Sequence, residues 1–127
     1  MRDIRIAAAQ SEHRDGDKAY NLHRIDQLTA RAVASGAEVV SFHEGSITAY
    51  SYLQSATRDE LLEVAEEVPG GPSCEALREI SARHGVPVLA GLVERDEGHM
   101  VVTASVAGHT AYPSLGPYSA TKHAAVA

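Results

Sequence analysis

The sequence predicts an α/β fold, an open sheet with flanking helices, because strand patterns and helix patterns alternate along the chain. Apolar runs at 4–10, 37–42 and 86–94 are typical of strands. The segments between them carry apolar residues three or four positions apart, which indicates helices. The chain has 127 residues, enough for one domain with a modest core.

The elements of the first half follow in order. IRIAAAQ (4–10) predicts the first strand. Helical spacing of apolar residues from Asp17 to Ser35, with Gly36 as the stop, predicts a helix. AEVVSF (37–42) lacks the alternation of a half-exposed strand, which favours a central, parallel position in the sheet.

Two further helices are expected before the next strand. Thr57 with Glu60 is a capping-box pattern for a short helix that runs through Glu67. Ser73 is expected to cap the following helix, and Gly85 to close it. The PGGP motif separates these two helices.

The last elements are a hairpin and the start of a helix. VPVLAGLVE (86–94) predicts the third strand, and MVVTAS (100–105) the fourth. The RDEGH turn between them is too short for a helical crossover, so we expect the fourth strand to run antiparallel to the third. Residues 118–127 are expected to begin a helix.

Composition excludes several classes of protein. A net charge of −6 without a basic stripe argues against a nucleic-acid surface, and no apolar run is long enough to cross a membrane. The lone Cys74 cannot form an intramolecular disulfide, and the N-terminus does not resemble a signal peptide, so we expect a cytoplasmic protein. In the stretch 98–127 the only formal charge is Lys122. That shift in charge indicates either a buried C-terminal segment or one of different origin.

Residues 1–97 resemble the first part of the nitrilase, or carbon–nitrogen hydrolase, superfamily. The resemblance is carried by IRIAAAQ, NLHRIDQLTARAVASGAEVVSFHEGSITAY and VPGGPSCEALREISARHGVPVLAGLVERDEG. It implies a partial α-β-β-α layer and hydrolysis of a carbon–nitrogen bond in a small amide or nitrile. It also implies that Glu44 is the general base of a Glu–Lys–Cys triad, although the family more often has proline where this chain has His43.

Glu44 is chemically suited to that role. Attack on an amide or nitrile carbon needs a thiolate, and a nearby carboxylate can accept the thiol proton. Without the resemblance, the same residue could cap a helix or form a salt bridge. The family's lysine and cysteine come later in the domain, and Cys74 lies where the family has no nucleophile. We therefore expect a partial hydrolase, inactive by itself.

Residues 98–127, GHMVVTASVAGHTAYPSLGPYSATKHAAVA, resemble the active-site segment of the short-chain dehydrogenases/reductases. The resemblance implies a catalytic set of Ser105, Tyr118 and Lys122. The tyrosine and lysine, four residues apart, would share one helical face, where the ammonium would lower the phenol pKa. The first strand is not followed by a glycine-rich turn, so we expect no nicotinamide cofactor to bind tightly.

Three interpretations therefore stay open: a carbon–nitrogen hydrolase fragment, a dehydrogenase-related oxidoreductase fragment, and a non-catalytic chimera of the two segments. The histidines show no ligand-pair spacing, so no metal site is expected, and we interpret them as surface or hydrogen-bonded residues (His13, His23, His43, His84, His99, His109 and His123). An incompletely covered sheet predicts a homo-oligomer with residues 100–127 near the contact.

Overall fold

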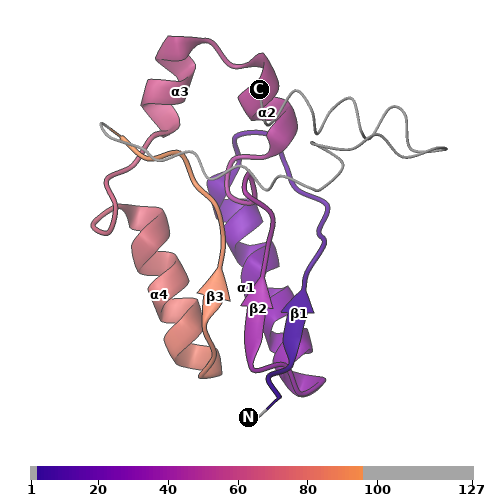
Figure 1. The fold of residues 1–127 in the computed structure, drawn as a ribbon. Helices are drawn as coiled ribbons and strands as arrows, with labels where there is room; N and C mark the ends of the chain where they lie inside the picture. The colour runs from indigo at the N-terminus through magenta and orange to yellow at the C-terminus, as the bar shows by residue number, and fades with distance from the viewer. Residues whose placement is uncertain (1–2, 96–127) are drawn as a thin grey trace, which may run out of the picture.

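The computed structural model describes residues 3–95, which form a small parallel sheet with helices (Figure 1). The sheet order is β1-β2-β3. The strands are β1 (Ile6–Ala8), β2 (Val39–Ser41) and β3 (Val88–Leu89). The predicted α/β class and the central, parallel position of the second strand are confirmed.

The ladders are shorter than the apolar runs that predicted them. β1 pairs with β2 from Ile6 opposite Val39 onward, and β2 pairs with β3 at Val40–Val88 and Ser41–Leu89. Farther along, the third run contributes only an isolated bridge between its Glu94 and Glu66.

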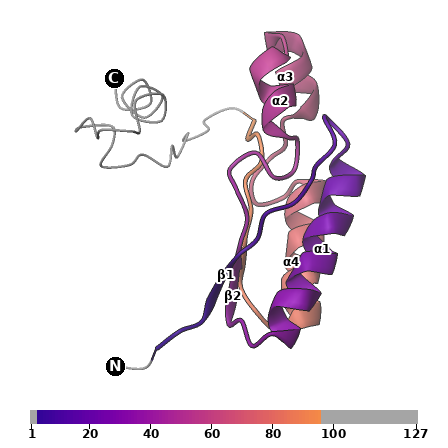
Figure 2. The ribbon, with the colours of Figure 1, turned by 90° about the vertical axis from the view of Figure 1, so that its right-hand side faces the viewer.

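Four helices connect or follow the strands in the described part of the chain. They are α1 (Lys18–Ala34), α2 (Tyr50–Ser55), α3 (Arg58–Val64) and α4 (Pro72–His84). Figure 2 shows α1 and α4 packed on one face of the sheet, whereas α2 and α3 lie beyond the carboxyl ends of the strands.

Most helix ends agree with the sequence. Asp17 caps α1 by accepting a hydrogen bond from the Tyr20 N–H, and Gly36 follows the helix with a φ of 87°. The capping box of Thr57 and Glu60 is present at α3. Gly85 ends α4 in the left-handed conformation, as predicted.

Two helix predictions are corrected, and one helix was missed. The helix from Thr57 ends at Val64 instead of Glu67, because the chain becomes extended and Glu66 bridges to the third apolar run. Ser73 is not the cap of α4, since Gly71 occupies that position and the Ser73 hydroxyl instead donates to Glu66. The short helix α2 was not predicted, because it buries none of its side chains and so has no apolar face to detect.

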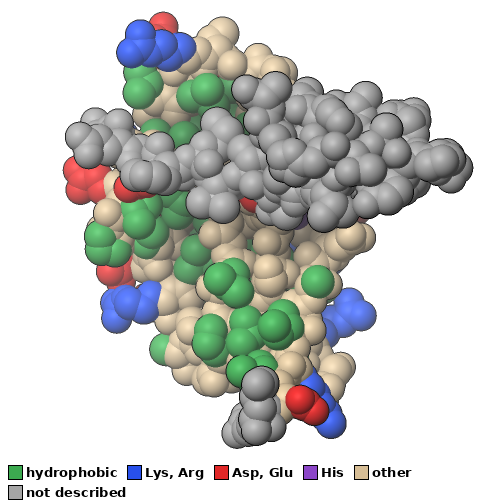
Figure 3. Space-filling view, in the orientation of Figure 1, with side chains coloured by type: hydrophobic (Ala, Val, Ile, Leu, Met, Phe, Trp, Pro, Cys, Tyr) green, Lys and Arg blue, Asp and Glu red, His purple; other side chains and the backbone are tan. Residues whose placement is uncertain are grey.

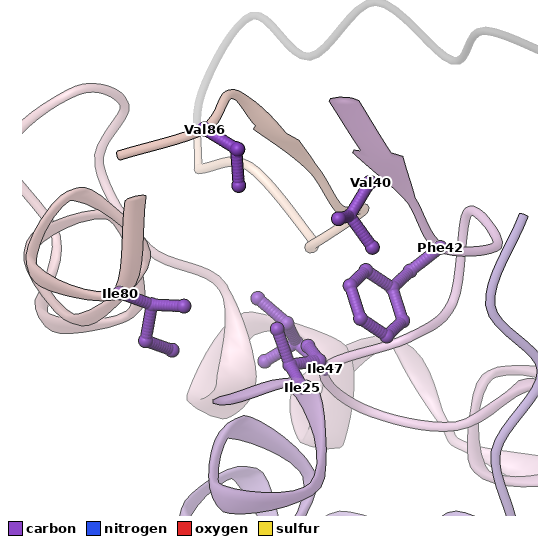
Figure 4. Close-up of a cluster of buried hydrophobic side chains, with 6 residues drawn as sticks. All are labelled: Ile25, Val40, Phe42, Ile47, Ile80 and Val86. Atoms are coloured by element: carbon purple, nitrogen blue, oxygen red, sulfur yellow. The ribbon is translucent and has the colours of Figure 1, made fainter. Parts of the chain in front are cut away.

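The core lies between the sheet and the two long helices. Figure 4 shows its side chains, which come from α1, α4, the strand segments and the turn after β2 (Ile25, Val40, Phe42, Ile47, Ile80 and Val86). Each fully buried aliphatic or aromatic side chain contributes about 1.5–3 kcal/mol to stability. This cluster anchors both ends of the turn that carries Glu44.

The opposite face of the sheet is apolar, and no described element covers it. Ile4, Ile6 and Leu89 are 61%, 66% and 56% exposed. Hydrophobic side chains gather over the strands on this face in Figure 3. None of the described helices is long and apolar enough to span a membrane. The predicted fourth strand and the helix at 118–127 fall outside the described residues.

Candidate functional site

Glu44 lies just beyond the carboxyl end of the central strand, in a turn held by the neighbouring strand segment. The Phe42 N–H donates to the Leu89 carbonyl at 2.8 Å. This bond extends the pairing of β2 with β3 to the start of the turn. Gly91 then packs against the backbone of Glu44 so closely that a Cβ there would be 1.7 Å from the Glu44 carbonyl oxygen. Only a residue without a side chain fits this contact, which fixes where the Glu44 backbone sits.

Hydrogen bonds fix the rest of the turn. The Gly91 N–H donates to Ser46 Oγ at 3.1 Å, and the Ile47 N–H donates to the Gly91 carbonyl at 3.3 Å. Ser46 and Ile47 are both buried. The base of the turn is therefore rigid, while the Glu44 side chain is exposed at the end of the sheet.

Tyr50 reaches back across the turn to Glu44. Its hydroxyl donates to Glu44 Oε2 at 2.6 Å, a short charge-assisted hydrogen bond. Partial burial, the hydrogen bond to Glu44 and the charge of that carboxylate together raise the pKa of Tyr50 to about 12. The phenol is therefore protonated at neutral pH and remains a donor to the carboxylate.

Two histidines extend this cluster. The ring of His43 stacks on Tyr50 with centroids 5.3 Å apart and an interplanar angle of 18°. The ring of His13 contacts that of His43 at a tilt, with centroids 5.1 Å apart and an interplanar angle of 54°. Burial and the neighbouring His13 lower the pKa of His43, against a smaller opposing effect of Glu44. At neutral pH the His43 ring is therefore uncharged.

The interpretation of the histidines as surface or hydrogen-bonded residues is wrong for His43. Its two ring nitrogens are buried and have no hydrogen-bond partner among the described residues. The ring is held by stacking instead, a contact made by tertiary packing that ligand-pair spacing does not reveal. Tyr50 was also missed, although its position six residues after Glu44 was visible in the sequence.

A second polar cluster surrounds the buried Glu66, which is 7% exposed. Lys18 Nζ lies 2.5 Å from Glu66 Oε1, and the Ser73 N–H and hydroxyl each donate to the carboxylate at 2.7 Å. Burial acts to raise the pKa of Glu66, but the bonds from Lys18 and Ser73 outweigh it and leave the pKa below its usual value. An open cavity of about 370 Å³ lies beside the cluster.

The Glu66 cluster ties distant segments together. Lys18 begins α1, Ser73 lies in the first turn of α4, and the Glu66 N–H donates to the Val93 carbonyl at 2.9 Å. These contacts hold the segment after β3, which includes the Gly91 that packs on Glu44. We assign the cluster a structural role because its donors and acceptors pair with one another.

The comparisons with known proteins identify the family of the chain. Residues 5–119 match the carbon–nitrogen hydrolase family, which is most of the chain. The chain belongs to the carbon–nitrogen hydrolase family. It is 26% identical over 115 residues to a nitrilase of Pyrococcus abyssi (strain GE5 / Orsay), a match that covers 91% of this chain and 42% of that protein.

A shorter match points to another protein class. Human 17-beta-hydroxysteroid dehydrogenase 13 is 49% identical over 39 residues, which cover 31% of this chain and 13% of the dehydrogenase. The chain thus spans less than half the length of either relative. The division into segments 1–97 and 98–127 stays a prediction, as do the roles of Ser105, Tyr118 and Lys122, which lie outside the described residues.

The environment of Cys74 disfavours the thiolate form of its side chain. Cys74 is the third residue of α4, where the end of a helix would favour a thiolate. Burial, followed by the charges of Glu66, Glu75 and Glu94, instead raises its pKa. The thiol is therefore protonated at neutral pH. Within residues 3–95, no group of three or more histidine, cysteine or acidic side chains is placed to hold a metal ion.

Proposed function

We propose that this chain supplies the part of a carbon–nitrogen hydrolase that carries the general base, and that Glu44 is that base. The observation that carries the proposal is the position of Glu44 at the carboxyl end of the central strand, with its backbone pinned by Gly91 and its carboxylate held by Tyr50. Ligands of open parallel sheets bind at this edge. The substrate class is a small amide or nitrile.

Glu44 would act by accepting a proton from a nucleophilic thiol. The thiolate then attacks the amide or nitrile carbon, and a cation stabilises the charge that develops on the substrate. Among residues 3–95, which hold one lysine and one cysteine, the thiol of Cys74 stays protonated and the ammonium of Lys18 is bound to Glu66. We therefore expect no turnover of amides or nitriles by these 127 residues alone.

The open face of the sheet supports a second layer over the sheet, supplied by further chain or by another copy of the protein. Sheets with parallel strands are ordinarily covered on both faces, and this one carries Ile4, Ile6 and Leu89 on its bare side. A second layer on that face would give the α-β-β-α arrangement. If the face is not covered within the chain, self-association would shield it, which supports a homo-oligomer.

Transfer of the base-bearing segment tests the proposal. Residues 1–95 would replace the matching segment of the Pyrococcus nitrilase, and ammonia release from amides and nitriles would be measured. We expect turnover that Glu44→Gln reduces by about 10²–10⁴-fold, the usual contribution of a general base. The matched control is Glu75→Gln, at an exposed glutamate on α4. Turnover that survives Glu44→Gln, or a folded fusion without turnover, would contradict the assignment.

A second candidate function rests on the dehydrogenase match of 39 residues. A serine, a tyrosine and a lysine at 105, 118 and 122 would exchange a proton with a substrate hydroxyl or carbonyl. Titration calorimetry with NADH and NADPH tests it. We expect no binding, whereas micromolar affinity would favour this function over hydrolysis.

A further inference from the structure

We propose that Tyr50 is a positioning residue for Glu44, and that His43 supports it by stacking against the face of the phenol ring. The proposal rests on the assignment of Glu44 as a general base. It adds a second residue to the site and explains how an exposed glutamate could be held in one orientation.

The backbone gives Tyr50 a fixed origin. Tyr50 is the first residue of α2, and the Ala49 before it is fully buried with a φ of 76°. The Ala49 N–H donates to the Gly45 carbonyl at 2.8 Å, which closes the turn between Glu44 and Tyr50. A Cβ on Gly45 would lie 3.3 Å from the Tyr50 nitrogen, so the turn is tightly closed.

The side chain of Tyr50 is fixed at both ends. Its ring lies nearly parallel to that of His43, and its hydroxyl is 2.6 Å from Glu44 Oε2. A tyrosine has only two side-chain torsions, so few other side-chain conformations are open to Tyr50 once its ring is stacked. The ring of His13 also contacts His43, with centroids 5.1 Å apart.

The consequence for Glu44 is a carboxylate with a defined orientation. A base contributes most when its geometry is set before the reaction, because the entropy of orienting it is then already lost. The phenol holds Oε2 and thereby fixes the direction of the other oxygen. Tyr50 itself need not touch the substrate.

The test is the ionisation of Tyr50 in the intact chain. The chain would be labelled at tyrosine ¹³Cζ, the Tyr50 signal assigned with Tyr50→Phe, and its titration followed by NMR. We expect Glu44→Gln to lower the Tyr50 midpoint from about 12 by about one pH unit or more, a tenfold change in the ionisation constant. Glu75→Gln is the matched control and should leave it unchanged. An unchanged midpoint in Glu44→Gln would overturn the proposal, since a ring that only packs would not respond to the carboxylate.

The support by His43 is tested in the same way. His43→Ala removes the stack and should lower the Tyr50 midpoint toward 10, because the phenol loses part of its burial, the largest cause of its raised pKa, and holds its hydrogen bond to Glu44 less well. The exposed His23, replaced by Ala, is the control. A Tyr50 midpoint equal in both histidine variants would exclude His43 as the support.

These readouts separate the positioning role from the proposed function. They need no turnover, so loss of the Tyr50 response would contradict positioning even if Glu44 is a base. In an active fusion with the nitrilase, Tyr50→Phe should lower kcat about tenfold with little change in KM. An unaffected kcat would refute positioning alone, whereas activity independent of Glu44 would refute the proposed function and the positioning role that rests on it.

Discussion

Ala49→Gly should relieve strain that the turn after Glu44 imposes on the backbone. Ala49 has a φ of 76° and a ψ of 143°, a conformation that residues other than glycine rarely adopt. Such conformations raise the energy by about 1–3 kcal/mol. The turn holds Ala49 there because its N–H is bonded to Gly45 and because Tyr50 must start α2.

Two losses oppose the relief of strain. The methyl group of Ala49 is fully buried, and its removal costs about 0.8 kcal/mol. Glycine also loses about 0.5–1 kcal/mol more than alanine through backbone entropy. The net change in the free energy of unfolding is therefore between a loss of about 0.8 and a gain of about 1.7 kcal/mol.

Ala65→Gly is the matched control that isolates the strain. Ala65 is 4% exposed, with an ordinary φ of −68° and ψ of 140°. It suffers the same two losses without any relief, about 1.5 kcal/mol in all. Ala49→Gly should thus be about 1–3 kcal/mol more stable than Ala65→Gly.

Urea unfolding followed by circular dichroism would measure both variants. The linear extrapolation gives each free energy of unfolding, and the slope shows whether the unfolding transition has changed. Equal destabilisation of the two variants would refute the reasoning, because it would mean that Ala49 carries no strain.

Three other perturbations follow from the same contacts. Gly91→Ala should lose about 1–3 kcal/mol of stability or more in urea unfolding, because its Cβ would overlap the backbone of the candidate base, whereas Gly70→Ala, with no atom within 4 Å, should be tolerated. Glu66→Gln should lose about 2 kcal/mol by breaking a buried charged network, and Glu75→Gln, on the surface, almost nothing. The pKa of Glu66 is lowered in the folded protein, so its contribution to the free energy of unfolding is present above about pH 4.5 and is lost as the pH falls through the folded pKa. The Glu66→Gln variant should therefore lose less stability than the unmodified chain when both are acidified. His43 has a lowered pKa, so stability should fall as the pH drops below about 6.5, and His43→Phe should remove that part of the pH dependence in denaturation at pH 5 to 7. A pH profile that His43→Phe leaves unaltered would contradict the burial of the neutral ring.

The sequence was a good guide to the two long helices and to the order of elements. The limits of α1 and the left-handed Gly85 after α4 depend on residues within a few positions of each other. A continuous apolar run likewise predicted that β2 is central, because a strand covered by two neighbours and a helix layer must be apolar on successive residues. Glu44 was placed at the end of that strand from the same pattern.

Other local patterns were misleading because a distant residue competed for the same group. Ser73 looks like a helix cap, yet its hydroxyl and N–H both bind Glu66, which is also bound by a lysine 48 residues away. A capping pattern depends only on neighbouring residues, so it does not show that Glu66 binds the same groups of Ser73. The extent of the third strand was overestimated for a related reason, since the segment around Gly91 packs against the Glu44 turn instead of continuing the ladder.

The sequence by itself determined the α/β class, the central strand and the carboxylate at its end, because these follow from apolar periodicity and from residue types at fixed local spacing. Only the tertiary structure decided how that carboxylate is held. The stack of His43 on Tyr50 and the bond from Tyr50 to Glu44 depend on how the turn folds back on itself, and the contact with Gly91 requires a distant segment to meet that turn. Their energies depend on distance and burial, which folding sets and which no local pattern of residues records.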